Sequence, residues 1–282
     1  MKTIENISRM STFAKMMKKE GKSIGLVPTM GYLHDGHLSL VKAAKKHTDV
    51  VVMSIFVNPI QFGPKEDFEE YPRDLKHDEE MAREAGVDVI FHPSLKDIYP
   101  EGYATYVTVE KLTSNLCGES RPGHFRGVAT VVTKLFNIVK PEVAYFGQKD
   151  MQQAMMIKKM ALDLNMDIEI KIMPIVREKD GLAMSSRNTY LSGSERRDAA
   201  VLYQSLLKAE TLIKNGERDA GKVIKAIEDM IKAKESARIE YVKLVDARGL
   251  KDIKTITGEI AIAVAVFFSN TRLIDNITIM VK

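Results

Sequence analysis

The sequence predicts an α/β protein: a Rossmann-like, doubly wound parallel sheet followed by a smaller C-terminal α+β domain that contains an antiparallel sheet. Two observations lead to this prediction. Apolar runs alternate with amphipathic stretches along most of the chain, as in parallel strands that are covered by helices. Near the C-terminus, the last two apolar runs have no helix-length segment between them, which favours antiparallel pairing.

The N-terminal part contains the alternating pattern. Its candidate strands are residues 24–27, 50–57, 87–91, 143–146 and 168–173. Its candidate helices, with apolar residues at three- and four-residue spacing, are residues 39–47, 74–85, 128–140 and 150–164. We expect the methionine-rich stretch 151–160 to lie in a helix core.

The pattern changes after about residue 190. Ser192 to Glu195 resembles a helix start, and two amphipathic helices are expected to end near residues 216 and 236. Strands are expected at residues 239–245, 260–267 and 273–281. With a boundary in the region 177–188, we predict an N-terminal domain at residues 1–180 and a smaller domain at 181–282.

Composition excludes several classes of protein. The chain has 282 residues, 45% apolar and 28% charged, the balance of a globular protein. Its 42 Lys and Arg residues against 38 Asp and Glu are spread along the sequence, so no nucleic-acid partner is expected. Cys117 is the single cysteine, no apolar run is long enough to cross a bilayer, and residues 1–10 lack the apolar core that is typical of a signal peptide. We therefore expect a cytoplasmic protein with no membrane partner.

The first chemical motif is the ten-residue block PTMGYLHDGH, residues 28–37. It lies between a predicted strand and a helical pattern, where open α/β sheets bind ligands and where free backbone N–H groups favour anions. His34 and His37 are three residues apart and can face one bound group. Imidazole donors there suit a triphosphate, because adenylyl transfer spreads negative charge over the phosphates. In the alternative interpretation, one histidine caps the helix and the other lies on the surface; the strand-turn-helix context favours phosphate binding.

The second motif is Met184-Ser185-Ser186-Arg187, which follows the loop 177–183. Two hydroxyls and a guanidinium form a set of phosphate donors, and an arginine can bind two phosphate oxygens at once. Alone, such a tripeptide is more often a solvated turn. Its co-occurrence with the two histidines favours a loop that closes over ATP.

The two motifs together resemble the nucleotidyltransferase superfamily, with its HxGH motif and its loop related to the KMSKS signature. Further blocks resemble the pantothenate synthetase family, in order along the chain. They are Val57–Gly63, Tyr71–Arg73, Cys117–Gly127, Phe146–Gln153 and Arg272–Asn276.

The resemblance implies a reaction. Pantoate and ATP form pantoyl adenylate and pyrophosphate, and β-alanine then attacks the acyl carbon to give pantothenate and AMP. ATP is thus a substrate, Mg²⁺ is implied with it, and the family is dimeric, so a homodimer is expected. We expect the N-terminal domain to bind ATP and pantoate and the C-terminal domain to act as a lid.

The resemblance also implies site residues. Those implied in catalysis are His34, His37, Lys149 and Arg187. Those implied in ATP binding are Met30, Gly31, Tyr32, Leu33, His34, Asp35, Gly36, His37, Gly147, Gln148, Lys149, Asp150, Val176, Met184, Ser185, Ser186 and Arg187. Those implied in pantoate or β-alanine binding are Gln61, Gln153 and Met30.

Several other residues have plainer interpretations. Asn58 is interpreted as shaping the turn before Pro59, with substrate contact as an alternative. The pair Asp78 and Glu79 is interpreted as a solvated helix face, with a water-mediated contact to Mg²⁺ as the alternative; the metal ligands remain unknown. Cys117 is expected to be buried and structural. The block 121–126 is interpreted as a loop that contacts either β-alanine or a neighbouring subunit.

Two other functions remain open at this stage. One is a related adenylyltransferase that transfers the nucleotidyl group to a phosphate ester. The other is a tRNA-binding or nucleotide-sensing module without turnover. Gln61, Gln153 and the C-terminal domain argue against the first. The modest net charge and the absence of an anticodon-binding domain argue against tRNA binding, and the intact His34, His37, Lys149 and Arg187 argue against a sensor without turnover.

Overall fold

The computed structural model describes residues 1–64 and 66–281, which form two compact units. Unit 1 comprises residues 1–110, 121–148 and 153–174. Unit 2 comprises residues 111–120, 149–152 and 175–282. The short segments 111–120 and 149–152 thus belong to the same unit as the C-terminal part of the chain.

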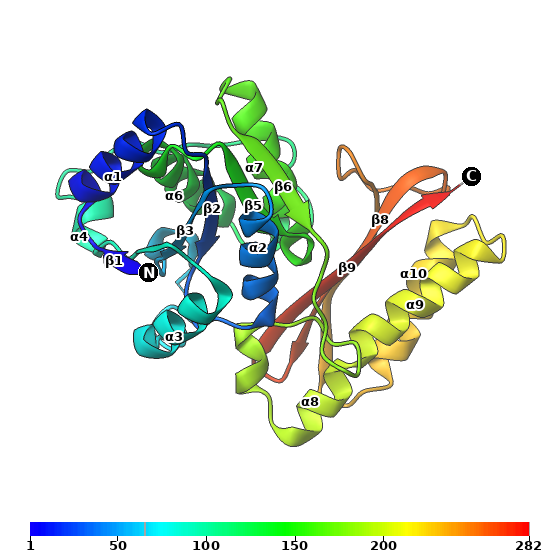
Figure 1. Ribbon diagram of the computed structural model, residues 1–282. Coiled ribbons are helices and arrows are strands. Elements are labelled where there is room, and N and C mark those ends of the chain that lie inside the picture. Colours follow the sequence, from blue (N-terminus) through cyan, green and yellow to red (C-terminus); the bar gives the residue numbers. More distant parts are fainter. Residues whose placement is uncertain (65, 282) are drawn as a thin grey trace. The chain divides into compact units, whose positions relative to one another are not determined.

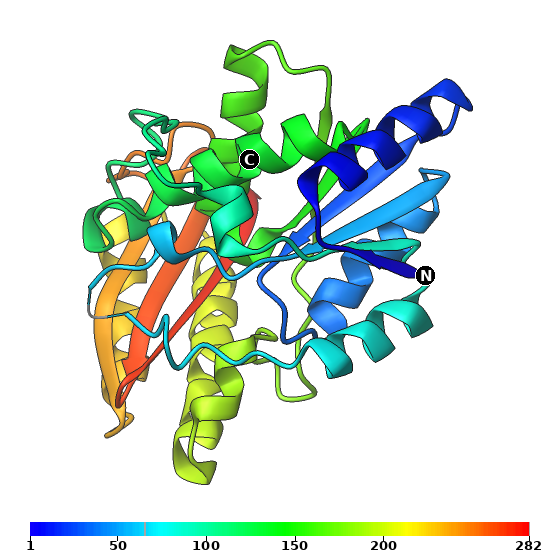
Figure 2. The same ribbon diagram turned by 90° about the vertical axis from the view of Figure 1, so that its left-hand side faces the viewer.

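Unit 1 is built on a six-stranded sheet with the order β1-β4-β3-β2-β5-β6, in which all the pairs are parallel. Its strands are β1 (Lys2–Ile4), β2 (Ile24–Thr29), β3 (Val50–Ile55), β4 (Val89–Phe91), β5 (Val143–Gly147) and β6 (Glu169–Met173). The doubly wound parallel sheet is therefore confirmed. The edge strand β1, dark blue at the N label in Figure 2, is additional to the predicted strands.

Helices cover both faces of this sheet. They are α1 (Ile7–Lys19), α2 (Asp35–Lys45), α3 (Leu75–Ala85), α4 (Leu95–Ile98), α6 (His124–Val139) and α7 (Met151–Asp163), the last beginning within unit 2. Helices α2 and α3 share one buried cluster with the sheet, whereas α1 and α6 pack together on the opposite face (Figure 1). Met151, Met156 and Met160 are buried, so the expected helix core is confirmed.

The strand order places a topological switch point at β2. The chain runs from β2 to β3 on one side, and later returns as β5 on the other. At their carboxyl ends, β2 leads into residue 30, β3 into residue 56 and β5 into residue 148. In open α/β sheets this edge is where ligands bind.

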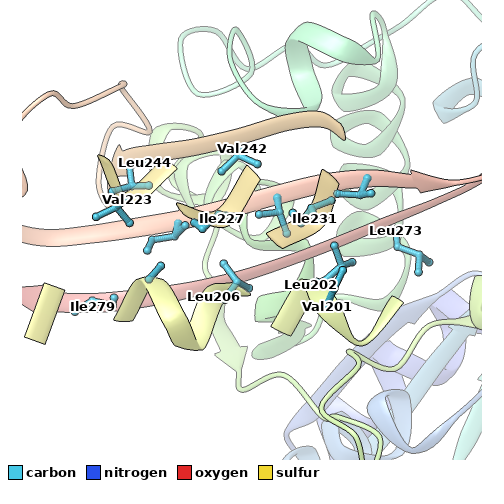
Figure 3. Packing of buried hydrophobic residues seen from close by; sticks show 14 of the residues in the cluster. Val201, Leu202, Leu206, Val223, Ile227, Ile231, Val242, Leu244, Leu273 and Ile279 are labelled. Carbon is cyan, nitrogen blue, oxygen red and sulfur yellow. The ribbon is translucent and has the colours of Figure 1, made fainter. Parts of the chain in front are cut away.

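Unit 2 contains a three-stranded antiparallel sheet in the order β7-β8-β9, which confirms the predicted meander. Its strands are β7 (Ala237–Asp246), β8 (Gly258–Phe268) and β9 (Thr271–Val281), and its helices are α5 (Cys117–Ser120), α8 (Gly193–Ala199), α9 (Val201–Lys214) and α10 (Ala220–Lys232). Apolar side chains of α9 and α10, including Leu206 and Ile227, face those of the strands in a single core (Figure 3). The predicted capping box of Ser192 and Glu195 starts α8.

Two helices start earlier than their apolar periodicity predicted. Helix α2 starts at Asp35, where the side chain of His34 caps it, and α6 starts at His124 after Gly123, whose φ is +85°. Short 3-10 helices, η1 (Pro59–Gln61), η2 (Gln148–Asp150) and η3 (Ser186–Tyr190), carry motif residues. Within residues 1–64 and 66–281, no helix has both the length and the apolar character that a membrane crossing requires.

Candidate active site

The turn between β2 and α2 needs a glycine at position 31. Gly31 has a φ of +83°, and a Cβ there would lie 2.7 Å from a carboxylate oxygen of Asp78 and 3.0 Å from the side chain of Ile55. A larger residue would therefore be strained and would also displace Asp78. The turn that carries the histidines is thus packed closely against α3.

Asp78 is buried, with 1% of its surface exposed, and it holds this turn. Its carboxylate accepts hydrogen bonds from the backbone nitrogens of Tyr32, at 2.9 Å, and Leu33, at 2.7 Å. Burial raises the pKa of Asp78 above its ordinary value, although these two hydrogen bonds oppose the shift. The interpretation of Asp78 as part of a solvated helix face was wrong, because its partners lie on the turn after β2.

The two motif histidines are oriented by backbone N–H groups. The nitrogen of Gly36 donates to His34 Nδ1 at 3.1 Å, and the nitrogen of His34 donates to His37 Nδ1 at 3.3 Å. The ring centroids lie 4.0 Å apart. Because a backbone N–H can only donate, each Nδ1 is an acceptor, and the neutral ring carries its hydrogen on Nε2. Both imidazoles therefore present an Nε2–H donor.

Most backbone N–H groups of this turn already have partners. Asp78 binds those of Tyr32 and Leu33, the hydroxyl of Thr29 accepts from Gly31 at 3.2 Å, and the rings accept from His34 and Gly36. The expectation that free backbone donors would bind the anion is therefore wrong for these residues. His34 does cap the helix, as the alternative interpretation held, and it does so through Nδ1 rather than through Nε2.

Gln61, expected to bind substrate, lies at the end of η1 and is buried at 9% exposure. Its side-chain nitrogen lies 3.1 Å from the sulfur of Met30, so the structure brings these two predicted substrate residues together. Its side-chain oxygen accepts from Asn58 at 3.0 Å. The Asn58 side chain makes no capping hydrogen bond to η1, but it bridges the turn that contains Pro59 by donating to the Gln61 side chain.

The block 121–126 supports the main chain of Gln61. His124 is buried, and its Nδ1 lies 2.8 Å from the Gln61 carbonyl oxygen. Arg121 contacts His124 Nε2 at 3.1 Å and donates two hydrogen bonds to Glu66, at 2.7 and 2.6 Å. Although burial opposes it, the hydrogen bond and charge of Arg121 hold the pKa of Glu66 below its ordinary value.

In unit 2, a buried polar cluster on β9 surrounds Lys149. Asn276 donates to the Lys149 carbonyl oxygen at 2.9 Å, and Asp275 forms a two-pronged ion pair with Arg177 at 2.6 and 2.9 Å. Burial lowers the pKa of Lys149, and the nearby Arg187 lowers it further, whereas Asp150 opposes the shift. Asp275 and Arg272 also act on Lys149 in opposite directions, so burial is the main cause of the lowered pKa.

The second motif lies in a loop that is folded on itself. Arg177 and Ala183 form an antiparallel bridge, and the nitrogen of Met184 donates to the Val176 carbonyl oxygen at 3.0 Å. The Ser185 hydroxyl accepts from the Arg187 nitrogen at 3.3 Å. The serine hydroxyl therefore caps η3 and orders the segment that carries Arg187.

The predicted site residues are divided between the units. Unit 1 carries residues 30–37, Gln61, Gly147, Gln148 and Gln153, whereas unit 2 carries Lys149, Asp150, Val176 and residues 184–187. Sequence reasoning missed the contacts that Asp78, Asp275 and Asn276 make with motif residues. Asp275 and Asn276 could have been noticed in the sequence, because a charged and an amide side chain interrupt the apolar strand β9.

Cys117 is buried, as expected. Its sulfur lies 3.1 Å from the Tyr241 hydroxyl and 3.6 Å from Arg272, which is paired with Glu240. The backbone nitrogen of Cys117 donates to Gln152 at 3.0 Å. These contacts join the segment 111–120 to the sheet of unit 2.

Comparisons with known proteins cover nearly the whole chain. A family model described as pantoate-beta-alanine ligase matches residues 2–278. The pantothenate synthetase of Acetivibrio thermocellus is 58% identical over 281 residues, and that of Moorella thermoacetica is 56% identical over 282 residues, with 100% of each chain covered.

Solved structures agree with these sequence matches. A crystal structure of the pantothenate synthetase from Thermus thermophilus has a TM-score of 0.94 and 43% identity, covering 98% of this chain and 99% of that one. The pantoate-beta-alanine ligase from Francisella tularensis, complexed with beta-gamma ATP and beta-alanine, has a TM-score of 0.80 and 35% identity, covering 98% and 97%. The likeness therefore extends over both units of the fold.

Proposed function

Because the chain belongs to the pantoate–β-alanine ligase family, we propose that the residues described above bind the substrates of that reaction. The enzyme condenses pantoate with β-alanine, using ATP, to give pantothenate, AMP and pyrophosphate. The observation that best supports the residue assignment is the oriented pair His34 and His37 at the topological switch point of unit 1.

The reaction needs an activated acid. A carboxylate is a poor acyl donor, because its leaving group would be oxide. In the first step a carboxylate oxygen of pantoate attacks the α-phosphorus, the bond to the bridging oxygen breaks, and pyrophosphate leaves. In the second step the amine of β-alanine attacks the acyl carbon, the bond to the adenylate oxygen breaks, and AMP leaves while the amine loses a proton.

In unit 1, His34 and His37 are proposed to donate from Nε2 to phosphate oxygens. Charge grows on the pyrophosphate as it leaves, so donors that are already oriented stabilise the transition state more than the ground state. Gly147 and Gln148, at the carboxyl end of β5, are proposed to contact the nucleotide. Gln61, Met30 and Gln153 are proposed to bind pantoate or β-alanine.

In unit 2, Lys149 and Arg187 are proposed to bind phosphate, and Asp150 to accept hydrogen bonds from ribose hydroxyls. The backbone of Val176 is proposed to contact adenine, and residues 184–186 to contact phosphate. A lid role for the C-terminal domain remains a proposal. It predicts that ATP slows hydrogen exchange in the 177–187 loop, measured by mass spectrometry, and equal exchange with and without ATP would contradict it.

We also propose that Mg²⁺ accompanies ATP. Among residues 1–64 and 66–281, no group of three His, Cys, Asp or Glu side chains is placed to hold a metal ion. Phosphate oxygens with water are common Mg²⁺ ligands, so the donor set fits an ion that enters with the nucleotide. When bound, the ion would neutralise phosphate charge.

The assembly is proposed to be a cytoplasmic homodimer that binds neither nucleic acid nor a membrane. Light scattering coupled to size-exclusion chromatography would test the dimer, since a monomer of 31.7 kDa is readily distinguished from twice that mass. Salt-sensitive RNA binding without AMP formation would favour the binding-module alternative instead.

The decisive experiment for the reaction follows the products by mass spectrometry. The protein is mixed with ATP, magnesium, β-alanine and pantoate labelled with oxygen-18 in its carboxylate, and each component is omitted in turn. We expect AMP and pantothenate in equal amounts, with label transferred to AMP. Appearance of ADP, or AMP without label, would rule out carboxylate adenylylation.

A further inference from the structure

We propose that Tyr99 is a positioning residue for the acid substrate. Through Asn58 it fixes the amide of Gln61 so that this amide donates a hydrogen bond to a substrate oxygen. The inference rests on the proposed role of Gln61 in pantoate binding, and it adds a residue outside the motifs that the sequence singled out.

The orientation of the Asn58 amide is set by a backbone carbonyl. Asn58 Nδ2 lies 3.2 Å from the Gly127 carbonyl oxygen, which can only accept a hydrogen bond. The amide nitrogen must therefore face Gly127, and the amide oxygen faces the Tyr99 hydroxyl, 2.8 Å away. A flipped amide would place two acceptor oxygens against each other.

The orientation passes from Asn58 to Gln61. The second hydrogen of Asn58 Nδ2 is directed at Gln61 Oε1, at 3.0 Å. Gln61 Nε2 then points the other way, toward the sulfur of Met30 at 3.1 Å. A thioether is a weak acceptor, so this nitrogen would gain by donating to a carboxylate or hydroxyl oxygen of the acid.

Tyr99 supplies the remaining hydrogen bond of the Asn58 side chain. Asn58 is 1% exposed, so an amide oxygen without a donor there would carry a desolvation cost. Burial raises the pKa of Tyr99, and neighbouring Tyr103 and Tyr106 raise it further, so the hydroxyl remains protonated and able to donate. The hydroxyl of Tyr99 thus favours one amide orientation.

The main chain of Gln61 is fixed separately. His124 Nδ1 contacts its carbonyl oxygen at 2.8 Å, and a Cβ on Gly127 would lie 2.7 Å from its Cα. With the backbone held on these sides, the orientation of the side-chain amide depends on the hydrogen-bond chain from Tyr99. Loss of the Tyr99 hydroxyl should therefore affect the acid substrate more than the nucleotide.

The test compares two hydroxyl deletions in one aromatic stack. The ring centroids of Tyr99 and Tyr103 lie 5.0 Å apart, so Tyr103→Phe is a matched control for Tyr99→Phe. We expect Tyr99→Phe to raise the KM for pantoate about tenfold, the scale of one lost hydrogen bond, and to leave the KM for ATP unchanged. Tyr103→Phe should change neither constant. Equal effects of the two variants would overturn the inference.

A double-mutant cycle separates this inference from the proposed role of Gln61. If Tyr99 acts through Gln61, Tyr99→Phe has no further effect on the KM for pantoate once Gln61→Ala is present. Multiplied effects would show that Tyr99 acts by another route. If Gln61→Ala alone leaves the KM for pantoate unchanged, the proposed role of Gln61 fails instead.

The donor claim can be tested without altering Tyr99. Gln61→Glu keeps the shape and the acceptor facing Asn58, but replaces the donor nitrogen with an oxygen. We expect it to weaken pantoate binding more than Gln61→Ala does, because a second carboxylate repels the carboxylate of the substrate. Pantoate binding by Gln61→Glu equal to that of the unaltered enzyme would overturn the claim.

Discussion

His37 Nδ1 accepts a hydrogen bond from the backbone nitrogen of His34, 3.3 Å away. His34 Nδ1 is bound in the same manner by Gly36, so both rings depend on an unprotonated Nδ1. A doubly protonated imidazole would direct an N–H at another N–H and would open the turn. The geometry therefore favours neutral rings, so the role proposed for His37 is hydrogen-bond donation from Nε2 rather than proton transfer to the leaving group.

Substitutions of His37 can separate a donor from an acid. The amide nitrogen of His37→Gln reaches about the position of Nε2 and can donate a hydrogen bond, whereas His37→Asn reaches only the position of Nδ1. We expect His37→Ala and His37→Asn to slow pantoyl adenylate formation by about 100-fold or more, the scale of a lost transition-state donor, and His37→Gln to be affected less. Rapid-quench single-turnover experiments would measure this. If His37→Gln is as slow as His37→Ala, proton transfer is supported.

Asp78 should control how well the histidine turn binds ATP. Asp78→Asn retains one acceptor oxygen. Its amide nitrogen, however, would face a backbone N–H group that donates to the carboxylate in the natural protein, so two donors would oppose each other. We expect a higher KM for ATP and slower adenylate formation, with little change in the KM for β-alanine, measured by steady-state kinetics. Glu79→Gln is the matched control, because Glu79 lies next to Asp78 and contacts the exposed hydroxyl of Thr3. Similar losses in the two variants would contradict a specific role for Asp78.

Asp78 also gives a prediction for stability against pH. Burial raises its pKa in the folded protein above 3.8, so its contribution to stability is fully present below that pH and is lost as the pH rises through the folded pKa. The free energy of unfolding of the natural protein minus that of Asp78→Asn should therefore fall as the pH rises from 3.8. Urea unfolding of both proteins across this range would measure the difference. If this difference in the free energy of unfolding grew with pH, the hydrogen bonds to Asp78 would lower its pKa by more than burial raises it.

The sequence was sufficient for the fold because apolar runs and helical periodicity are local signals. The strands of both sheets were predicted closely, apart from β1, whose three residues are too few to show a pattern. Contacts between distant residues could not be predicted. Asp78 and Tyr32 are 46 positions apart, and Arg177 and Asp275 are 98 apart, so neither pairing leaves a signal in the local sequence. The motif contained the histidines and the backbone N–H groups that orient their rings, but it gave no indication of Asp78, which holds the turn.

Gly127 is expected to be essential for the packing of α6 against η1. A Cβ at this position would lie 2.4 Å from the Ile60 carbonyl oxygen, and neither backbone segment can yield easily. We expect Gly127→Ala to lower the free energy of unfolding by roughly 1–3 kcal/mol, as overpacking does, and to raise the KM for pantoate by shifting Gln61. Denaturant unfolding and kinetics would measure both effects.

Gly63→Ala provides the control for this prediction. Gly63 lies in the segment after η1, but a Cβ there would meet only the Glu66 side chain, at 3.7 Å, an ordinary contact distance. Its stability should change by less than that of Gly127→Ala. Comparable stabilities of Gly127→Ala and the natural protein would show that α6 and η1 can separate without cost.

Proton uptake should accompany ATP binding at Lys149. Burial lowers the pKa of this lysine below 10.5 despite the opposing charge of Asp150, so the neutral form is favoured relative to a lysine in water. A bound polyphosphate brings negative charge, which favours the protonated form and raises the pKa. ATP should therefore bind with uptake of a proton between the lowered pKa and 10.5, and its affinity should fall as the pH rises through that window.

Calorimetry can measure this uptake, because titrations in buffers with different ionisation enthalpies give different apparent heats when protons are exchanged. Lys149→Arg is the matched variant, since a guanidinium remains protonated throughout this range. We expect the heat of ATP binding to depend on the buffer in the natural protein, and this dependence to be smaller in Lys149→Arg. Equal dependence in both proteins would assign the proton to another group and would remove the support that the shifted pKa gives to Lys149 as a phosphate ligand.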